Sequence, residues 1–449
     1  MDGPLFADLN LLAARNQMAI SLGFHIIFAA LGIGFPLITL IAHWRGLRTG
    51  DMHYLELARR WSKTMAVLFA VGAVSGTILS FEMGILWPGL MGPFGDVIGL
   101  PFTLEAVSFF LEAIFIGIYL YGWKRLSARL HFLSLFPIVL SGIAGSFFIL
   151  SANAWMNNPA GFRFIDGEVS RVDPWAAMFN SGVWVQYVHM LLAAYMVSGF
   201  LVAGVYAWGW TQGRRDPHHY LGFMIPFTVA ALASPIQILV GDVAARRLIE
   251  AQPAKFAAME LIPEGGRSLP LTLGGIYRDG DVVGAIEIPG LASFLGTRDF
   301  NGELPGLDQF PDDELPPVNI VHFSFQVMVG LGVLMLALSA TFGIAWWRHR
   351  RPPQGRWFWR SAALAGVASV IAMEAGWITT EVGRQPWIVY GLVRTADAVT
   401  EADGIIWSLI GTTIVYLGLT AGTVVSLRRI AVGLRRGRDV ATPYGPSPR

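Results

Sequence analysis

Glu381 and Arg384 lie within one helical turn of each other in GWITTEVGRQPW, residues 376–387, where an apolar run of membrane-crossing length meets a polar segment. An acid at that depth in a membrane is costly, so a functional role is the default hypothesis for it. Such a carboxylate needs a cation, a proton or a metal ion as its partner. The motif therefore predicts a chemical site at the membrane boundary.

Two histidines lie well inside apolar runs, His25 in GFHIIF and His189 in QYVHM. Because an intramembrane histidine needs a hydrogen-bond acceptor or a metal, each is either a haem ligand or a hydrogen-bonded packing residue. Met328 in FQVMVGLG is one of fifteen methionines, and a lone methionine usually fills a core. A His189–Met328 axial pair would favour electron transfer at an iron, but spacing in the sequence does not prove that they meet.

Two acids, Glu105 and Glu112 in EAVSFFLE, are seven residues apart among Phe, Leu and Ile. Two helical turns place them on one face, roughly 10 Å apart along the axis. A buried carboxylate tends to be protonated unless it is paired, so the two are candidate stations of a proton path, with helix–helix hydrogen bonds as the alternative. Glu374 is a further buried acid with no assigned role, and Glu82 is interpreted as an interfacial residue.

Lys255 and Glu260 are five residues apart in QPAKFAAME, which predicts a short helix in a loop. A charge pair of this kind is usually a solvated face or a weak salt bridge. By itself, the spacing does not indicate a ligand.

The composition is typical of a polytopic membrane protein: 54% of the 449 residues are hydrophobic, 14% are charged, and the mean hydropathy is +0.53. A net charge of +1 gives no indication of nucleic acid as a partner. The absence of cysteine excludes disulfides, thiolate-held metals, iron–sulfur clusters and the C-x-x-C-H haem attachment. Any metal must therefore be held by His, Met or carboxylate.

Nine apolar stretches of about 20 residues, enough to cross roughly 30 Å of hydrocarbon, predict an all-α fold with nine transmembrane helices. They centre near 17–42, 62–82, 99–122, 131–152, 182–209, 221–241, 319–346, 361–380 and 404–427. Lys and Arg, which resist translocation, gather after the first, third, fifth, seventh and ninth stretches. The N-terminus is therefore expected outside and the C-terminus in the cytoplasm.

The chain divides into four parts: residues 1–241 with the first six helices, an extracytoplasmic loop over 242–318, residues 319–430 with the last three helices, and a cytoplasmic polar tail over 431–449. Within the loop, residues 276–288 predict a hairpin that turns at Asp279-Gly280. A second Asp-Gly turn is expected at Asp166 and Gly167. Loops of such length are usually functional or disordered.

Seven motifs, in order along nearly the whole chain, together resemble subunit I of the cytochrome bd-type quinol oxidases. They are GFHIIF, EAVSFFLE, NAWMNNPAG (residues 153–161), QYVHM, QPAKFAAME, FQVMVGLG and GWITTEVGRQPW. GRQPW is a specific signal in this setting. The outer loop is then the one that the family calls the Q-loop, here of the short kind, with Gln326 where the long-loop branch has Arg.

The resemblance implies a membrane complex that oxidises quinol at the outer face and reduces dioxygen to water, with three haems and no copper. His189 and Met328 match the ligands of a low-spin haem b, and His25 matches the ligand of the oxygen-reactive haem, with Glu105 beside it. Glu381 matches the ligand of a high-spin haem b, with Trp377 and Arg384 as neighbours. Glu112 matches the acid of a proton route from the cytoplasm. Lys255 and Glu260 match the quinol-site pair.

The resemblance also implies a second membrane subunit, subunit II, as partner, small single-span subunits as further candidates, and a prokaryotic cytoplasmic membrane as the location. The segment SFEMGILWP around Glu82 is similar to the cyanide-insensitive branch, so the oxygen-reactive haem is either haem d or a third haem b. Ubiquinol and menaquinol both stay open as substrates. A transporter or channel is the alternative, although this class of protein does not explain the pattern of His and Met residues in the apolar runs.

Overall fold

Long apolar helices make up most of the protein, and the computed structural model describes residues 4–166 and 168–435. Within these residues, nine helical stretches are long and apolar enough to cross a membrane, as the sequence predicts. They are α1 (Pro4–Thr49), α2 (Met52–Leu86), α3 (Pro88–Gly122), α4 (Ala128–Leu133) continued by α5 (Leu135–Asn157), α7 (Val183–Thr211), α8 (Pro217–Ala251), α11 (Val318–His349), α12 (Arg356–Val382) and α14 (Ile405–Arg435). Residues 436–449 of the predicted tail lie outside the described residues.

Short polar segments start several of these helices. The side chain of Asp51 accepts a hydrogen bond from the backbone N–H of His53 and so caps α2, and Asp216 caps α8 in the same way through His219. An aspartate at this position satisfies one of the backbone donors that the first turn of a helix leaves unpaired.

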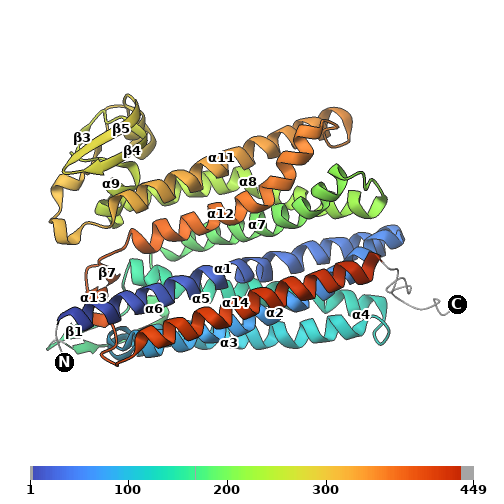
Figure 1. Ribbon diagram of the computed structural model, residues 1–449, viewed down its shortest axis with the longest axis horizontal. Coiled ribbons are helices and arrows are strands. Elements are labelled where there is room, and N and C mark those ends of the chain that lie inside the picture. Colours follow the sequence, from blue (N-terminus) through green and yellow to red (C-terminus); the bar gives the residue numbers. More distant parts are fainter. Residues whose placement is uncertain (1–3, 167, 436–449) are drawn as a thin grey trace.

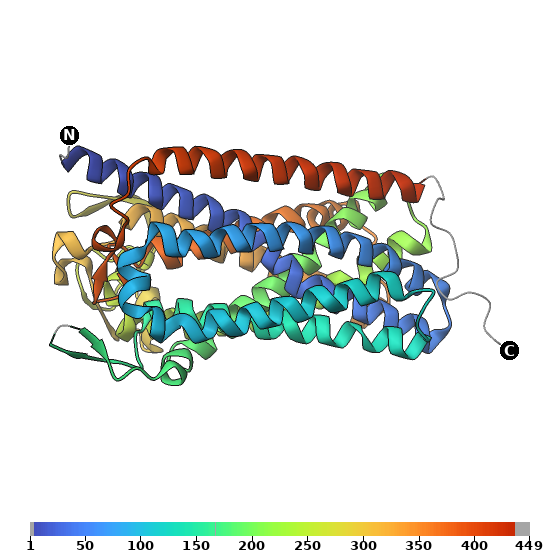
Figure 2. The same ribbon diagram turned by 90° about the horizontal axis from the view of Figure 1, so that it is seen from below.

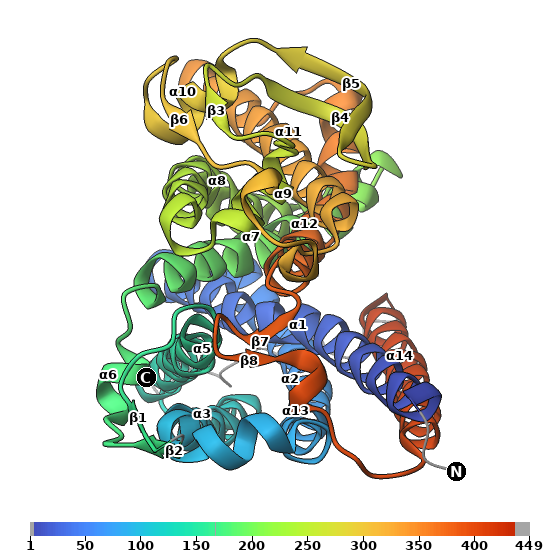
Figure 3. The same cartoon turned by 90° about the vertical axis from the view of Figure 1, so that its left-hand side faces the viewer.

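The long helices form two groups, and α1, which belongs to one of them, also packs against α7 of the other (Figure 3). In one group, α7 packs on α8 and α12, and α11 packs on the same two helices, so α7 and α11 lie diagonally across it. The other group contains α1, α2, α3 and α5, and α14 lies at its edge against α1 and α2. Each group has its own apolar core, one around Trp61 and Tyr119 and the other around Phe223 and Trp359.

All the strands and the short helices α6, α9, α10 and α13 lie at the end of the molecule where α1 begins (Figures 1 and 2). The connections after α1, α3, α7 and α11, near which Lys and Arg gather, lie at the opposite end. Two small hairpins belong to the first end. They are β1 (Arg163–Ile165) with β2 (Glu168–Ser170), near α6 (Pro174–Met178), and β7 (Trp387–Val389) with β8 (Val393–Arg394), followed by α13 (Thr395–Ala398).

The segment between α8 and α11, called the Q-loop below, is a folded unit rather than an irregular loop. Its elements are α9 (Pro253–Glu260), β3 (Gly266–Arg267), β4 (Leu271–Arg278), β5 (Asp281–Ile288), α10 (Leu291–Thr297), β6 (Glu303–Leu304) and the 3₁₀ turns η1 (Leu307–Gln309) and η2 (Asp312–Glu314). Strands β4 and β5 pair antiparallel with Arg278 opposite Asp281, so the predicted turn at Asp279-Gly280 is confirmed. Both turn residues have positive φ, 52° and 92°, as a two-residue hairpin turn requires.

Three details differ from the sequence-based expectations or go beyond them. Helix α8 continues to Ala251, about ten residues past the predicted start of the loop at Asp242, because residues 242–251 are good helix formers and Asp242 pairs with Arg246 one turn later. Glu82, near the outer end of α2, is 5% exposed and is therefore buried within the protein. At the second predicted turn, Ile165 pairs with Glu168, while Gly167 lies outside the described residues.

Candidate functional site

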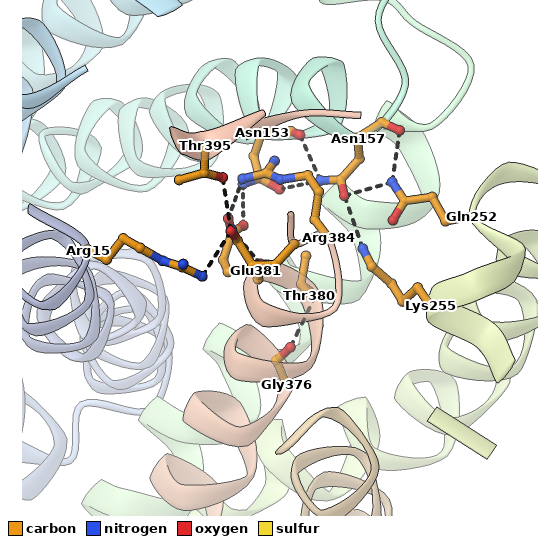
Figure 4. A network of polar contacts seen from close by, with 11 residues as sticks. Arg15, Asn153, Asn157, Gln252, Lys255, Gly376, Thr380, Glu381, Arg384 and Thr395 are labelled. Carbon is orange, nitrogen blue, oxygen red and sulfur yellow. Dashed lines mark hydrogen bonds and ion pairs between the residues drawn. The ribbon is translucent and has the colours of Figure 1, made fainter. Parts of the chain in front are cut away.

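A chain of hydrogen bonds joins the Q-loop to Glu381, near the end of α12, through two asparagines at the end of α5 (Figure 4). The Nζ of Lys255 lies 3.2 Å from Oδ1 of Asn157, whose Nδ2 lies 3.2 Å from Oδ1 of Asn153. Asn153 in turn donates from Nδ2 to Oε1 of Glu381 at 2.7 Å. The structure thus connects two residues that the sequence places 126 positions apart (381 − 255).

Local sequence positions each part of this chain. Asn153 and Asn157 are four residues apart on α5, so their side chains lie one above the other on one face. Gln252, between α8 and α9, donates from Nε2 to both the backbone oxygen and Oδ1 of Asn157, at 2.9 and 3.0 Å. Pro253 then starts α9, where its missing N–H costs no helical hydrogen bond. These contacts hold α9, and with it Lys255, against the end of α5.

Glu381 and Arg384 form a direct ion pair, with Nη2 of the arginine 2.5 Å from Oε2 of the carboxylate. Arg384 is 4% exposed, and its Nε and Nη1 have no hydrogen-bond partner among the described residues. A buried guanidinium with two unused donors has room for a further anionic or acceptor group. The Glu381 carboxylate is itself paired on both oxygens, by Asn153 and Arg384.

The two predicted quinol-site residues have pKa values near neutrality. Burial, and then the positive charge of Arg384, lower the pKa of Lys255 to about 7, while Glu381 opposes the shift. Burial raises the pKa of Glu260, at the other end of α9, to about 7. Near neutral pH, both side chains can therefore exchange protons with a bound molecule. Glu260 is not part of the hydrogen-bond chain to Glu381.

His189 and Met328 lie on the diagonal helices α7 and α11, at the end of the group next to the Q-loop. The apolar core of this group includes Met196 and Met335, each seven residues further along its helix from the predicted ligand. Nδ1 of His189 is buried without a hydrogen-bond partner among the described residues, and its Nε2 lies 3.3 Å from Nε2 of Gln237.

Glycines stand next to both of these side chains. A Cβ on Gly241 of α8 would lie 3.2 Å from Cε1 of His189, and one on Gly376 of α12 would lie 2.8 Å from Sδ of Met328. The absence of a side chain at each glycine therefore lets the predicted ligand pack closely against the backbone of the neighbouring helix.

His25 on α1 is held by α2. Its Nδ1 lies 3.0 Å from Oγ of Ser75, and this hydroxyl already donates to the backbone oxygen of Gly72. When the hydroxyl donates to Gly72, its oxygen accepts from Nδ1–H of His25, and Nε2 is then the unprotonated nitrogen. That tautomer suits metal ligation through Nε2, because ligating histidines usually donate their other ring N–H.

The remaining predicted residues lie outside the hydrogen-bond chain from Lys255 to Glu381. Glu112 is 9% exposed and faces Gly142 of α5, and Glu105 lies two turns away on α3. Trp377, on α12, packs against two apolar clusters that include Ala194 and Tyr187 of α7. Glu374 has no role predicted from the sequence. Its Oε2 lies about 3.4 Å from the point where a Cβ on Gly23 would lie, two residues before His25 on α1.

Comparison with known proteins identifies the family of this chain. The chain matches the family described as cytochrome bd terminal oxidase subunit I over residues 13–433. The chain belongs to that family. A Bacillus subtilis (strain 168) protein, provisionally named as a cytochrome bd menaquinol oxidase subunit I, is 36% identical over 93% of this chain and 96% of its own length. Another protein from the same strain, named cytochrome bd ubiquinol oxidase subunit 1, is 31% identical over 98% of this chain and 97% of its own length.

A solved structure agrees with the family assignment. The bd oxidase of Geobacillus thermodenitrificans contains a chain with 37% sequence identity and a TM-score of 0.87, with 95% of this chain and 98% of that chain covered. The mostly helical fold of this subunit I is therefore the fold of the family, as the sequence predicts.

Four residues of the site in this subunit I have no role predicted from the sequence. Asn153, Asn157 and Gln252 occur in motifs that support the resemblance but have no role predicted from the sequence, and Ser75 lies outside these motifs. Amides at the polar end of an apolar run were the available signal for the asparagines. For Ser75, the sequence holds no signal, because serines on membrane helices commonly bond to their own backbone.

Proposed function

We propose that this protein is the haem-carrying subunit of a quinol oxidase that takes electrons from quinol at the outer membrane face and reduces dioxygen to water. Membership of the terminal oxidase family supports the class of reaction. The observation that carries the proposal is the hydrogen-bond chain from Lys255 to Glu381, because it connects the proposed quinol-site cation to the proposed haem ligand.

The side chains present fit three haems. His189 and Met328 would hold a low-spin haem b, and the buried, unpartnered Nδ1 of His189 supports this. His25 would hold the oxygen-reactive haem, either haem d or haem b, through the Nε2 that Ser75 leaves unprotonated. Glu381 would hold a high-spin haem b. When bound, these groups supply one-electron transfer and dioxygen binding, which no amino-acid side chain provides.

The unused donors of Arg384 support the placement of a haem next to Glu381. Haem carries propionate carboxylates, and a guanidinium is the side chain best suited to bind a carboxylate. Trp377, half-buried on α12 one turn before Glu381, would line the same space. In this role, Arg384 orients the group and balances its charge.

Lys255 and Glu260 would accept the protons that quinol loses when it is oxidised. A base works best when its pKa lies near the working pH, and burial gives both residues a pKa of about 7. Asn157 holds Lys255 in place, and Gln252 holds Asn157. The quinol class, ubiquinol or menaquinol, stays open because the two Bacillus relatives are named for different quinols.

Protons for water formation would come from the other side of the membrane through α3. Glu112 and Glu105 lie on one face of this helix two turns apart, which suits successive proton carriers. Because quinol protons leave outside while water formation takes protons from the cytoplasm, the reaction would separate charge without a pump. This arrangement requires the N-terminus outside and the C-terminus inside a prokaryotic cytoplasmic membrane, as the Lys and Arg distribution indicates. A subunit II would complete the complex.

The decisive experiment is a reduced-minus-oxidised visible spectrum of the purified complex with pyridine haemochrome analysis, together with quinol-dependent oxygen uptake. We expect low-spin and high-spin haem signals and oxygen uptake that requires quinol. Pyridine haemochrome analysis also distinguishes haem d from a third haem b. A colourless protein after expression with ample haem supply would overturn the proposal in favour of a transporter.

A further inference from the structure

Polar side chains of α1, α2 and α14 meet near the end of α2 and the start of α14. Nε2 of Gln17 on α1 lies 2.9 Å from Oε1 of Glu82 on α2 and 3.2 Å from Oγ1 of Thr412 on α14. Ser21, one turn after Gln17 on α1, lies beside the carboxyl group of Glu82. It also lies beside the hydroxyl of Tyr416, which is one turn after Thr412 on α14. The proposed function uses none of these residues.

Four of these side chains, called the polar cluster below, each have a buried polar atom without a hydrogen-bond partner among the described residues. The atoms are Oε1 of Gln17, Oγ of Ser21, Oε2 of Glu82 and the hydroxyl oxygen of Tyr416. All four side chains are at most 5% exposed. Because buried polar atoms in proteins nearly always have partners, four such atoms in one place indicate a bound molecule.

The hydrogen-bonding capacity of the four atoms identifies the molecule that fits. Oε1 of Gln17 and an ionised carboxylate of Glu82 accept hydrogen bonds, and the hydroxyls of Ser21 and Tyr416 can donate them. A water molecule donates two hydrogen bonds and accepts two, so a single water can satisfy all four atoms. If Glu82 carries a proton and donates, one hydroxyl can turn and accept from the water instead. The fit therefore does not depend on the charge of the acid.

Two other occupants fit the polar cluster less well. A monovalent cation would take the four oxygens as ligands, but it would leave the hydroxyl hydrogens of Ser21 and Tyr416 without acceptors. The described residues also contain no group of three or more His, Cys, Asp or Glu side chains that could hold a metal ion. An anionic group such as a haem propionate would lie against the carboxyl group of Glu82, and like charges at that distance repel each other.

Helix α14 has few other fixed points. Along its described part, only Ile405, Tyr416 and Thr423 are buried. The hydroxyls of Thr413, Thr420 and Thr423 bond to carbonyl oxygens of α14 itself. In a membrane, apolar side chains pack as well against lipid as against protein, so polar contacts contribute to where a helix docks. The docking of α14 should therefore depend on its polar contacts with α1 and α2.

We propose that the polar cluster binds one buried water molecule, which joins α14 to α1 and α2 inside the membrane. The direct bond from Gln17 to Thr412 supports the same contact. The ring of Tyr416 packs on Phe24 of α1, with 4.6 Å between the ring centroids, so its hydroxyl is held at a fixed place beside the cluster. The proposal is independent of the proposed function, because the cluster contains no proposed haem ligand or quinol-site residue.

The first test is a density map of the intact complex at a resolution that shows ordered water. We expect one peak within hydrogen-bond distance of all four oxygens of the polar cluster, roughly 2.6–3.2 Å. A Glu82→Gln variant should keep this peak, because an amide also bonds to water. A metal ion would lose its one acidic ligand in that variant. Direct bonds among the four side chains without a peak, or a peak that disappears in Glu82→Gln, would overturn the proposal.

A Tyr416→Phe variant tests what the water does for α14. The variant keeps the ring contact with Phe24 and removes one hydrogen bond of the water. In the intact complex, we expect hydrogen–deuterium exchange of residues 405–435 to become on the order of tenfold faster, which corresponds to the loss of about one buried hydrogen bond.

Thr420→Val is the matched control, because the hydroxyl of Thr420 bonds to the backbone oxygen of Tyr416 within α14. This variant should exchange at the wild-type rate. Equal exchange in the wild type and in Tyr416→Phe would show that the water does not hold α14. Neither test needs activity, so a complex that passes both but shows no quinol-dependent oxygen uptake would refute the proposed function and leave the water site intact.

Discussion

The sulfur of Met328 lies 2.8 Å from the point where a Cβ would stand on Gly376. That distance is shorter than any normal contact, so a methyl group on α12 would push the thioether aside. The absence of a side chain at residue 376 therefore gives Met328 its position between α11 and α12.

Gly376→Ala should consequently disturb the proposed low-spin haem without unfolding the protein. We expect a changed or lost low-spin signal in the reduced-minus-oxidised spectrum and a slower quinol-driven turnover, because the axial sulfur moves. Gly330→Ala is the matched control, since no atom lies within 4 Å of a Cβ at that position on α11. A normal spectrum in both variants would contradict this role of Gly376.

Met328→Leu should abolish the low-spin haem signal and quinol-driven turnover, because leucine has a similar volume but no ligating sulfur. The loss of stability should stay below about 1.5 kcal/mol, as for other volume-conserving exchanges. Met335→Leu, two turns deeper in the apolar core of the same helix, should leave the spectrum unchanged. If the spectrum of Met328→Leu resembles that of the wild type, Met328 is not a ligand.

Lys255→Met should lower kcat/KM for quinol by on the order of 100-fold, the typical contribution of a positioned base, while all haem signals remain. In the wild type, kcat/KM should rise with pH through about 7. Lys255 and Glu260, whose pKa values are both about 7, lose their protons there and become able to accept those of quinol. In the variant, only the part of this rise that comes from Glu260 should remain. Arg278→Ala, at an exposed cation of the same loop, is the control.

Asn157→Asp should shift the pH profile of quinol oxidation to higher pH. A carboxylate 3.2 Å from Nζ would stabilise the charged form of Lys255 and raise its pKa, so the neutral amine would form only at higher pH. We expect a shift of about one pH unit or more in the rising part of the profile. An unchanged profile would show that Lys255 is not the group that titrates.

Glu112→Gln should slow oxygen reduction while quinol still reduces the haems, because glutamine keeps the shape of the side chain and cannot carry a proton. Stopped-flow measurement of haem reduction and of reoxidation by dioxygen separates the two steps. Ser141→Ala, at another buried polar residue facing the same group of helices on α5, serves as a packing control. Reoxidation at the wild-type rate would exclude Glu112 as an obligatory proton carrier.

The sequence alone determined the nine long helices, the short helix with Lys255 and Glu260, and the hairpin at Asp279-Gly280. These features depend on neighbouring residues. A membrane requires about 20 consecutive apolar residues for each helix, and a two-residue turn requires particular residues at adjacent positions. Both features can therefore be recognised from consecutive residues in the sequence. The family motifs also predicted which residues matter, although their roles as haem and quinol ligands stay proposals.

Only the tertiary structure decided which polar groups meet. Lys255 meets Asn157 across 98 positions, Asn153 meets Glu381 across 228, and His322 meets Met259 and Gly274 across 63 and 48. It also decided that the buried carboxylate of Glu82 meets Gln17 of α1. No local pattern encodes such pairs, because a buried donor is satisfied by whichever acceptor the packing of distant helices brings within about 3 Å.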